Sequence, residues 1–343
     1  MTQKASTSSC LVIGGGISGL IAATVLRDRN MQVTVVDKGR AIGGRMATRR
    51  IRNSQYGEGT FDYGAQYFTA QDPKFQALVN SWIQEGIVKE WSLNQQILSK
   101  KVYYRGVNSN RSIAQHLAEN LDIHTNIKAI SFAWQDDHWQ VLTENNETFL
   151  ADVLILTPPL PQTLELLDRS QIQLPPETRH RLEEIVYHPC IALLALLAQP
   201  SQIPSPGGMQ LDGNLLSWIA CNQKKGISPQ GNAVTLHATS EFSRIHWDID
   251  NTVIANQLLE AASPWLGSSV IDYQVHRWRY SQPQTVYGEP YLVVTKPGPI
   301  VICGDAFIQP DVEGAVLSGL AAAEYLSEKG RGQRAEGRGQ KEE

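Results

Sequence analysis

Glycine and aspartate residues near the N-terminus have the types and the spacing of a nucleotide-binding site. Gly14, Gly16 and Gly19 form a G-x-G-x-x-G pattern after an apolar run, and Asp37 ends the next apolar run. The first glycine permits a tight turn, the second lets the backbone approach a pyrophosphate, and the third lets helix and strand pack closely. The first helical amides would face the phosphates, and Asp37 could accept a hydrogen bond from a ribose hydroxyl. The pattern therefore predicts a bound nucleotide.

A second glycine cluster follows the second apolar run. Gly43 and Gly44 would let the chain fold back against the same pyrophosphate, and Arg45 could neutralise it with a permanent planar cation. The alternative is an exposed basic loop, which suits Arg49 and Arg50 better than an arginine beside two glycines. The cluster indicates a cofactor that stays bound.

The surrounding elements predict an α/β fold with interleaved domains. A strand over 10–13, a helix over 18–30 and a strand over 32–36 form a β-α-β unit. Helices are then predicted over 72–86 and 112–121, and strands over 123–132, 139–143 and 148–155 as an antiparallel meander that ends at two prolines. Later segments predict helices over 176–185, 252–266 and 316–326, and strands over 191–197, 215–221, 233–239 and 300–303. The charged, GRGQ-repeating tail from residue 328 is expected to be disordered.

Composition excludes several other classes of function. A net charge of −4 gives no electrostatic footprint for nucleic acid, and glycines interrupt the apolar run at 11–26, so no membrane span is expected. The four cysteines are scattered and the histidines lack ligand spacing, which predicts a cytoplasmic location and no metal site. No G-x-S-x-G elbow supports a serine nucleophile.

Longer motifs at both ends of the chain resemble one flavoprotein family. Asp37 followed by R-x-x-G-G-R-x-x-T at 40–48 is similar to the family of amine oxidases, phytoene desaturases, renalases and UDP-galactopyranose mutase, in which these residues hold FAD. The C-terminal stretch "VICGDAFIQPDVEGAVLSGLAAAEYL" resembles the closing FAD motif of that family. There Asp305 would accept from a ribityl hydroxyl, and Gly314 would allow backbone amides near the isoalloxazine N1–C2=O edge.

The resemblance implies a Rossmann-like FAD-binding domain of the glutathione-reductase or p-hydroxybenzoate hydroxylase type, interleaved with an α+β substrate domain. The expected FAD domain covers 1–75, 106–165 and 276–327, the substrate domain covers 76–105 and 166–275, and the tail covers 328–343. The implied cofactor-binding residues are Gly14, Gly16, Ile17, Ser18, Gly19, Asp37, Lys38, Gly43, Gly44, Arg45, Met46, Gln66, Ile127, Thr157, Trp278, Gly304, Asp305, Glu313, Gly314 and Ala315.

Four further segments resemble the renalase branch of the family. They are "DYGAQYFT" at 62–69, "SWIACNQKK" at 217–225, "LHATSEFS" at 236–243 and "HRWRYSQP" at 276–283. This resemblance implies oxidation of the 2- and 6-dihydro isomers of NAD(P)H to NAD(P)+ by hydride transfer to flavin N5, with O2 reoxidising the flavin to give H2O2. Orientation alone can drive such a step, so no acid–base residue is expected. Gln66 and Tyr67 would lie near the flavin, and Thr239, Trp278 and Arg279 would line the substrate side.

Other family activities give alternative predictions. An amine oxidase would share the scaffold, but no cysteine lies between Cys221 and Cys303 to tether a flavin, so FAD is expected to be non-covalent. A desaturase would need an apolar membrane-facing entry, and none is marked. A non-redox mutase would need an arginine-rich sugar-nucleotide site. A catalytically silent flavin-binding protein is the last alternative.

Overall fold

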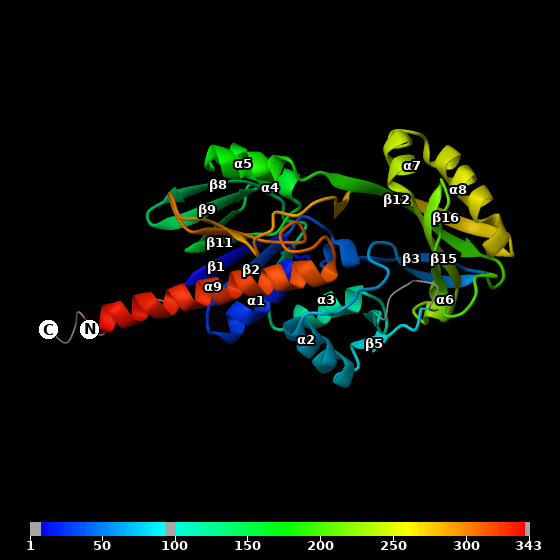
Figure 1. Ribbon diagram of the computed structural model, residues 1–343, viewed down its shortest axis with the longest axis horizontal. Helices are drawn as coiled ribbons and strands as arrows, with labels where there is room; N and C mark the ends of the chain where they lie inside the picture. The colour runs from blue at the N-terminus through cyan, green and yellow to red at the C-terminus, as the bar shows by residue number, and fades with distance from the viewer. Residues whose placement is uncertain (1–7, 94–100, 340–343) are drawn as a thin grey trace. The chain divides into compact units, whose positions relative to one another are not determined.

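The chain forms two discontinuous units, coloured by residue number in Figure 1, in a computed structural model that describes residues 8–93 and 101–339. The first unit comprises Met1–Gly44, Ala114–Val186 and Gln284–Glu343, and the second comprises Arg45–Ile113 and Tyr187–Pro283. Interleaving was expected, but the boundaries differ. Residues 45–75, 106–113 and 276–283 belong to the second unit, and residues 166–186 belong to the first. The parts of the predicted domains at 1–7, 94–100 and 340–343 lie outside the described residues.

A six-stranded sheet organises the first unit. Its strands, in spatial order, are β17 (Leu292–Val294), β18 (Ile300–Ile302), β11 (Val153–Leu156), β1 (Ser9–Ile13), β2 (Gln32–Asp37) and β7 (Asp122–Thr125). All neighbours pair in parallel except β17 with β18. The carboxyl ends of β18, β11, β1, β2 and β7 therefore share one edge, where parallel α/β sheets bind ligands.

Two helices pack side by side against one face of this sheet (Figure 1). They are α1 (Ile17–Asp28) and α9 (Val312–Gly339). Ala22 and Ala23 of α1 meet Ala322 and Ala323 of α9 over valines of β1, β2 and β18. Small residues are needed here, because a Cβ at Gly319 would overlap the backbone of α1. The prediction of disorder from residue 328 is wrong up to Gly339, because α9 continues to that residue. Glu, Lys, Arg and Gln are good helix formers, so they can extend a helix whose earlier part is already packed against the sheet.

The expected meander is divided between two sheets. Strands β8 (Ala129–Gln135), β9 (His138–Thr143) and β10 (Thr148–Ala151) form the antiparallel meander. The first and last predicted runs were too long, since β7 and β11 belong to the parallel sheet. A positive φ at Asn126 separates β7 from β8 and lets the chain change sheets.

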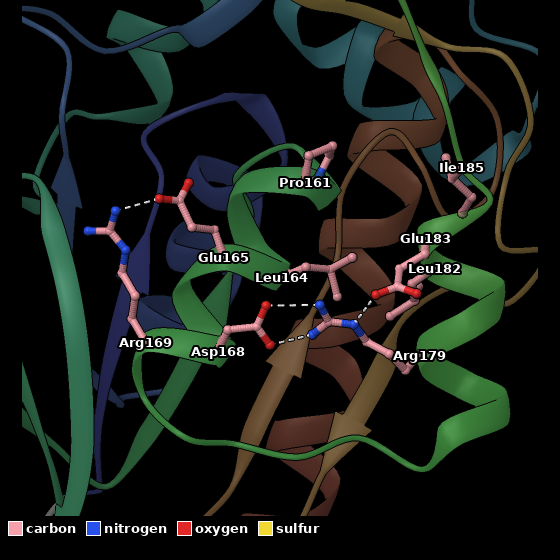
Figure 2. A pocket seen from close by; sticks show the side chains of 9 residues that line it. All are labelled: Pro161, Leu164, Glu165, Asp168, Arg169, Arg179, Leu182, Glu183 and Ile185. Atoms are coloured by element: carbon pink, nitrogen blue, oxygen red, sulfur yellow. Dashed lines mark hydrogen bonds and ion pairs between the residues drawn. The ribbon is translucent and has the colours of Figure 1, made fainter.

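Two prolines start a helix that the sequence pattern did not predict. Pro159 caps α4 (Leu160–Arg169), and Pro161 lies in its first turn, where a missing N–H costs nothing. The next helix, α5 (Pro176–Glu183), is joined to α4 by Arg179, whose guanidinium binds Asp168 at 2.6 and 2.9 Å and Glu183 at 2.6 Å. The ion pair of Arg179 and Asp168 lies beside a cleft between these helices (Figure 2), and the cleft has a volume of about 400 Å³.

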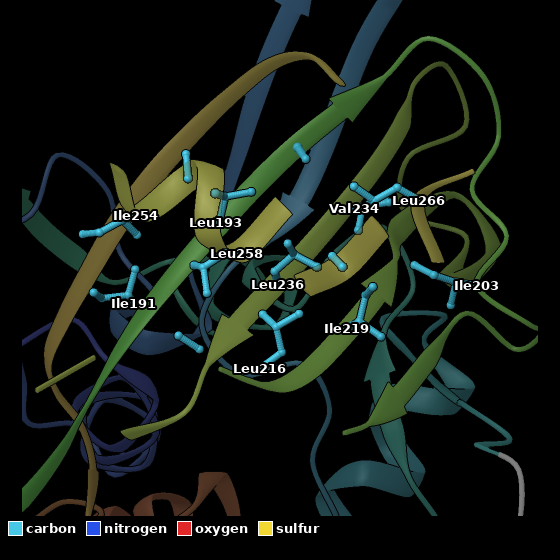
Figure 3. Packing of buried hydrophobic residues seen from close by; sticks show 14 of the residues in the cluster. Ile191, Leu193, Ile203, Leu216, Ile219, Val234, Leu236, Ile254, Leu258 and Leu266 are labelled. Atoms are coloured by element: carbon cyan, nitrogen blue, oxygen red, sulfur yellow. The ribbon is translucent and has the colours of Figure 1, made fainter. Parts of the chain in front are cut away.

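The second unit contains a five-stranded antiparallel sheet. In spatial order its strands are β13 (Gly208–Gln210), β14 (Leu216–Cys221), β15 (Asn232–Ala238), β12 (Tyr187–Leu197) and β16 (Val270–Pro283). The helix α8 (Asn251–Leu266) covers one face, where Leu258 packs among Leu193, Leu236 and Ile254 (Figure 3). The helices α6 (Asn222–Lys225) and α7 (Ser240–Ile245) follow β14 and β15.

A hairpin packs on the other face of that sheet, which is why residues 45–75 belong to the second unit rather than the first. The hairpin of β3 (Thr48–Asn53) and β4 (Gly57–Asp62) packs on that face through Ile51, Phe61 and Tyr63. The remaining elements of this segment are η1 (Gly44–Met46), α2 (Pro73–Gln84), β5 (Val88–Glu90), β6 (Tyr104–Gly106) and α3 (Arg111–Leu117). Within the described part of the chain, no helix combines the length and the apolar character of a membrane span.

Candidate functional site

The first glycine cluster forms a tight turn at the carboxyl end of β1. Gly14 has a φ of +115°, and a side chain there would overlap the Thr157 hydroxyl. A Cβ at Gly19 would overlap the carbonyl oxygen of Gly14, so α1 can approach the turn only with glycine at that position. Thr157 secures the turn from β11, with its hydroxyl 3.1 Å from the carbonyl oxygens of Ile13 and Gly14. The roles expected for the first and third glycines are thus visible as steric requirements.

The second glycine lies beside open space. Among the described residues, apart from the chain neighbours and the backbone of its own helix, no atom lies within 4 Å of a Cβ placed on Gly16, although its φ of −77° would suit any residue. Gly16 is also the N-cap of α1, without a side-chain cap and without an acidic residue in the first turn. The helix therefore offers its first amides and its positive dipole end to an anion, which fits a cofactor pyrophosphate.

The second glycine cluster folds back onto the first. The amide of Gly43 donates to the carbonyl of Gly15 at 2.8 Å, and a Cβ at Gly44 would lie 3.3 Å from the Cα of Gly16. Asp37 joins both turns, since its carboxylate accepts from the amides of Gly15 and Gly39, each at 2.6 Å. These bonds leave lone pairs on both oxygens for a ribose hydroxyl.

The remaining predicted residues of the first unit lie at the same sheet edge. Ile127 follows β7, and its amide donates to the carbonyl of Asp37 at 2.9 Å. Gly304, directly after β18 and Cys303, has a φ of +148° and donates to the hydroxyl of Ser318 at 2.9 Å. The residues Ile17 and Ser18 of α1, Asp305, and Glu313 and Ala315 of α9 are buried, while the amide of Gly314 donates to Asp311 at 2.9 Å. Lys38 differs, because its ammonium group donates to Gln162 of α4 at 2.8 Å.

A buried ion pair lies at the centre of the second unit. The ammonium group of Lys225 is 2.8 Å from Oδ2 of Asp62, and both side chains are 0% exposed. Oδ1 of Asp62 accepts from the hydroxyl of Thr48 at 2.7 Å and from the amide of Asn110 at 3.1 Å. Burial lowers the pKa of Lys225, and the attraction of Asp62 opposes that shift.

The same ion pair anchors the segment that contains Gln66. Lys225 also donates to the carbonyl of Gln66 at 2.7 Å, and the amide group of Gln66 donates to the carbonyls of Asp62 at 2.7 Å and Gly64 at 3.1 Å. We call residues 62–66 the Asp62–Gln66 segment. The carbonyl of Tyr63 accepts from Nε2 of His237 at 3.1 Å and from Nε1 of Trp278 at 2.9 Å, and that of Ala65 accepts from Nδ2 of Asn110 at 2.6 Å.

Aromatic rings surround this segment. Tyr63 stacks on Trp278 with a centroid distance of 5.1 Å, and His276 contacts both rings edge-on. Burial lowers the pKa of His237 to about 4, and burial together with Arg49 lowers the pKa of His276 to about 4. Both imidazoles are therefore neutral near pH 7, and His237 donates through Nε2 as a neutral tautomer.

The other predicted residues of the second unit have varied surroundings. The guanidinium of Arg45 lies 3.3 Å from the carbonyls of Tyr280 and Ser281, and Met46 is buried in η1. The ring of Tyr67 contacts Tyr103 and Trp218, whereas Arg279 lies over Trp247 at 4.9 Å. The hydroxyl of Thr239 caps α7 and donates to the carbonyl of Asn214 at 3.0 Å.

Sequence reasoning missed the roles of Lys225, Asp62 and His237. Lys225 lies 163 residues from Asp62, and a lysine on a short helix normally indicates a solvated surface. The available signal was that all three lie in the segments resembling renalases. In the described residues, no group of three His, Cys, Asp or Glu side chains could hold a metal ion.

Comparisons with known proteins identify the family of this chain. The family model of flavin-containing amine oxidoreductases matches residues 86–327, and that of NAD(P)-binding Rossmann-like domains matches residues 12–82. The chain belongs to the flavin-containing amine oxidoreductases. An FAD cofactor, an oxidoreductase activity and the Rossmann-like fold, all expected from the motifs, are confirmed. The renalase of Mus musculus is 25% identical over 340 residues, which cover 93% of this chain and 98% of that protein.

Solved structures of flavoenzymes share the fold. A protein from Exiguobacterium sp. 255-15 assigned as a protoporphyrinogen oxidase superimposes with a TM-score of 0.71 at 13% identity, over 94% of this chain and 99% of that one. A putrescine oxidase bound to putrescine superimposes with a TM-score of 0.68 at 14% identity, over 93% and 98% of the two chains. At these identities the likeness concerns the fold alone.

Proposed function

We propose that this flavoenzyme oxidises the 2- and 6-dihydro isomers of NAD(P)H to NAD(P)+, with O2 as the electron acceptor and H2O2 as the product. One observation carries the proposal. Three of the four segments that resemble renalases converge on the fourth, at 62–69, through hydrogen bonds from Lys225, His237 and Trp278 to the Asp62–Gln66 segment. The resemblance is thus concentrated in one hydrogen-bonded cluster, which a shared fold alone would not require.

The residues of the first unit would hold the cofactor. Gly16 and the first amides of α1 would contact the pyrophosphate, Gly43 and Gly44 would close over it, and Asp37 would bind a ribose hydroxyl. Asp305 and Gly314 would contact the ribityl chain and the ring edge. When bound, FAD supplies a hydride acceptor that dioxygen can reoxidise.

The residues of the second unit would orient the substrate. Thr239, Trp278 and Arg279 are the substrate-side residues we propose, and Tyr67 and Gln66, the latter held in a fixed conformation, would lie near the flavin. The imidazoles of His237 and His276 are neutral near pH 7, so they add no positive charge to this cluster. Hydride transfer needs no acid or base from the protein, so positioning is the contribution expected of these residues.

Anaerobic stopped-flow reduction tests this proposal. The purified protein is mixed with 6-dihydro-NAD(P), with 2-dihydro-NAD(P), with NADPH as the matched 4-dihydro isomer, and with putrescine. We expect rapid bleaching of the flavin by the 2- and 6-dihydro isomers, and one H2O2 per turnover after O2 is admitted. Bleaching by putrescine but by no dihydronicotinamide would refute the proposal and favour amine oxidation, the second function that the family match supports.

We also propose that FAD is bound non-covalently and that the protein is cytoplasmic. The cysteines at 10, 190, 221 and 303 are all free. Burial raises the pKa of Cys303 to about 12, which disfavours the thiolate needed for attachment. Precipitation with acid should leave all the flavin in the supernatant, and flavin retained in the pellet would contradict this part of the proposal.

A further inference from the structure

Gln66 presents a buried acceptor that has no partner. Its side chain is 5% exposed, and Oε1 makes no hydrogen bond within the described part of the chain. The orientation of the amide is determined, because Nε2 donates to the carbonyls of Asp62 and Gly64. Rotating the amide would turn Oε1 against those two carbonyl oxygens. A buried acceptor without a donor costs free energy, so such groups indicate an absent partner.

Trp218 presents the complementary group on the neighbouring strand. It is 7% exposed, and its Nε1 donor is also buried without a partner. Trp218 of β14 lies directly opposite His237 of β15, and Nε2 of His237 is 3.5 Å from Nε2 of Gln66. The ring of Tyr67, the next residue after Gln66, lies 5.3 Å from the ring of Trp218. One unsatisfied acceptor and one unsatisfied donor thus flank His237 and Tyr67.

A primary carboxamide has the matching chemistry. It carries an N–H donor for Oε1 of Gln66 and a carbonyl acceptor for Nε1 of Trp218. A protonated amine carries donors and no acceptor, so it could satisfy Oε1 of Gln66 but not Nε1 of Trp218. The aromatic rings of Tyr67, Tyr103 and Trp218 suit a carboxamide attached to a planar ring.

We propose that Gln66 and Trp218 form the subsite for the carboxamide of a nicotinamide ring, and that Lys225 is its positioning residue. The inference rests on the proposed function and names the group that makes the substrate recognisable. Lys225 ties the two ends of the Asp62–Gln66 segment together, through Oδ2 of Asp62 and the carbonyl of Gln66. Lys225 does not touch the ligand; its bonds keep Oε1 of Gln66 in place.

Equilibrium binding of NAD+ and two analogues tests the subsite without turnover. In 3-acetylpyridine adenine dinucleotide the N–H donor is replaced by a methyl group, and in thio-NAD+ the carbonyl oxygen is replaced by sulfur, a weak acceptor. Flavin fluorescence reports the Kd of each ligand. We expect the wild-type protein to bind NAD+ about tenfold more tightly than either analogue.

Variants separate the two hydrogen bonds. Gln66→Met should abolish the preference over the acetyl analogue and retain the preference over thio-NAD+, whereas Trp218→Phe should do the reverse. Lys225→Met should lose the preference over the acetyl analogue as Gln66→Met does. The matched control is Lys224→Met on the same helix, because Lys224 donates to the carbonyls of Ser201 and Ile203 and should leave both preferences unchanged. The variants of Gln66 and Trp218 keep the ion pair, so they test the subsite even if Lys225→Met does not fold.

Two results would overturn the assignment. Equal affinity of the wild-type protein for all three ligands would show that no carboxamide is recognised. A shift of the flavin absorption in Gln66→Met, together with an equal loss of affinity for every ligand, would show that Oε1 accepts from a flavin N–H instead. The outcome is independent of the proposed activity. A carboxamide preference without flavin reduction would refute the activity alone, and reduction without that preference would refute the subsite alone.

Discussion

His237 should make the second unit less stable as the pH falls below neutrality. The imidazole donates through Nε2 to the carbonyl of Tyr63, and burial lowers its pKa from 6.5 to about 4, against the opposing effect of that hydrogen bond. Lys225 adds electrostatic repulsion to the protonated form. Since the unfolded chain binds a proton more readily between these two values, stability is fully present above about pH 6.5 and is lost as the pH falls towards 4.

The size of the effect follows from the two pKa values. Between pH 7.5 and pH 5, a group with pKa 6.5 when unfolded and about 4 when folded removes at most about 2 kcal/mol of stability. Partial exposure of the side chain makes this an upper bound. His276 acts in the same direction, so the contribution of His237 must be measured as a difference between two proteins.

The variant His237→Gln supplies that difference. A glutamine amide can occupy the place of Nε2 and donate to Tyr63, but it does not titrate. Urea unfolding is followed by tryptophan emission from pH 5 to pH 8. We expect the wild-type protein to lose up to about 2 kcal/mol more than the variant over this range. His180→Gln, at an exposed histidine of α5, is the control that should retain the wild-type slope. Parallel curves for wild type and His237→Gln would refute the reasoning.

Three other predictions concern the glycine turn, Asp37 and the buried ion pair. Gly16→Ala should leave the apoprotein stable, because the added Cβ meets only open space, but it should prevent FAD binding, because that space is where we expect the pyrophosphate. Gly19→Ala should also destabilise the apoprotein, because its Cβ would overlap the carbonyl oxygen of Gly14. Calorimetry of both apoproteins measures the stability, and flavin absorbance measures the binding. Asp37→Ala should lose FAD on purification, and Asp37→Asn, which keeps one acceptor oxygen, should retain more of it; equal occupancy would contradict the role of the carboxylate. Lys225→Met should cost about 3–5 kcal/mol in urea unfolding, because it leaves the buried charge of Asp62 unpaired. Adding Asp62→Asn should restore part of that loss, since the amide is neutral and its Oδ1 can still accept from Thr48 and Asn110.

The glycine turns of the first unit could be predicted from the sequence, because the steric conditions that select glycine are local. Gly14 needs a positive φ, and Gly19 must lack a Cβ, so each requirement is met by one residue type at one place. The β-α-β unit was predicted from such residues together with the apolar runs beside them, and the C-terminal motif from its resemblance to the family. Prediction failed where a pattern had two meanings. Pro159 was interpreted as the end of a strand and is also the cap of α4, and the run over 148–155 contains strands of two different sheets.

The second unit was harder to predict, because its structure depends on hydrogen bonds between residues that are distant in the sequence. The three carbonyl oxygens of Asp62, Tyr63 and Gln66 accept from side chains that enter from β15, α6 and β16. The sequence separation between each donor and its acceptor follows no general rule, so no sequence pattern predicts these hydrogen bonds. Only the resemblance to relatives could have identified the residues that form them.

The contrast between local glycine turns in the first unit and distant side-chain hydrogen bonds in the second suggests how the chain would recognise a cofactor and a substrate differently. A cofactor used by a whole family can be bound by backbone geometry, because amides and glycine turns recognise a pyrophosphate whatever the flanking side chains are. A substrate must be distinguished by side chains, and buried side chains distinguish it only if they are held still before it arrives. In the second unit Lys225, His237 and Trp278 donate to the carbonyls of Gln66 and Tyr63 and so hold the Asp62–Gln66 segment, whereas Oε1 of Gln66 has no partner among the described residues. Specificity for the substrate should therefore change with substitutions in this cluster, while affinity for FAD should follow the glycine turns of the first unit.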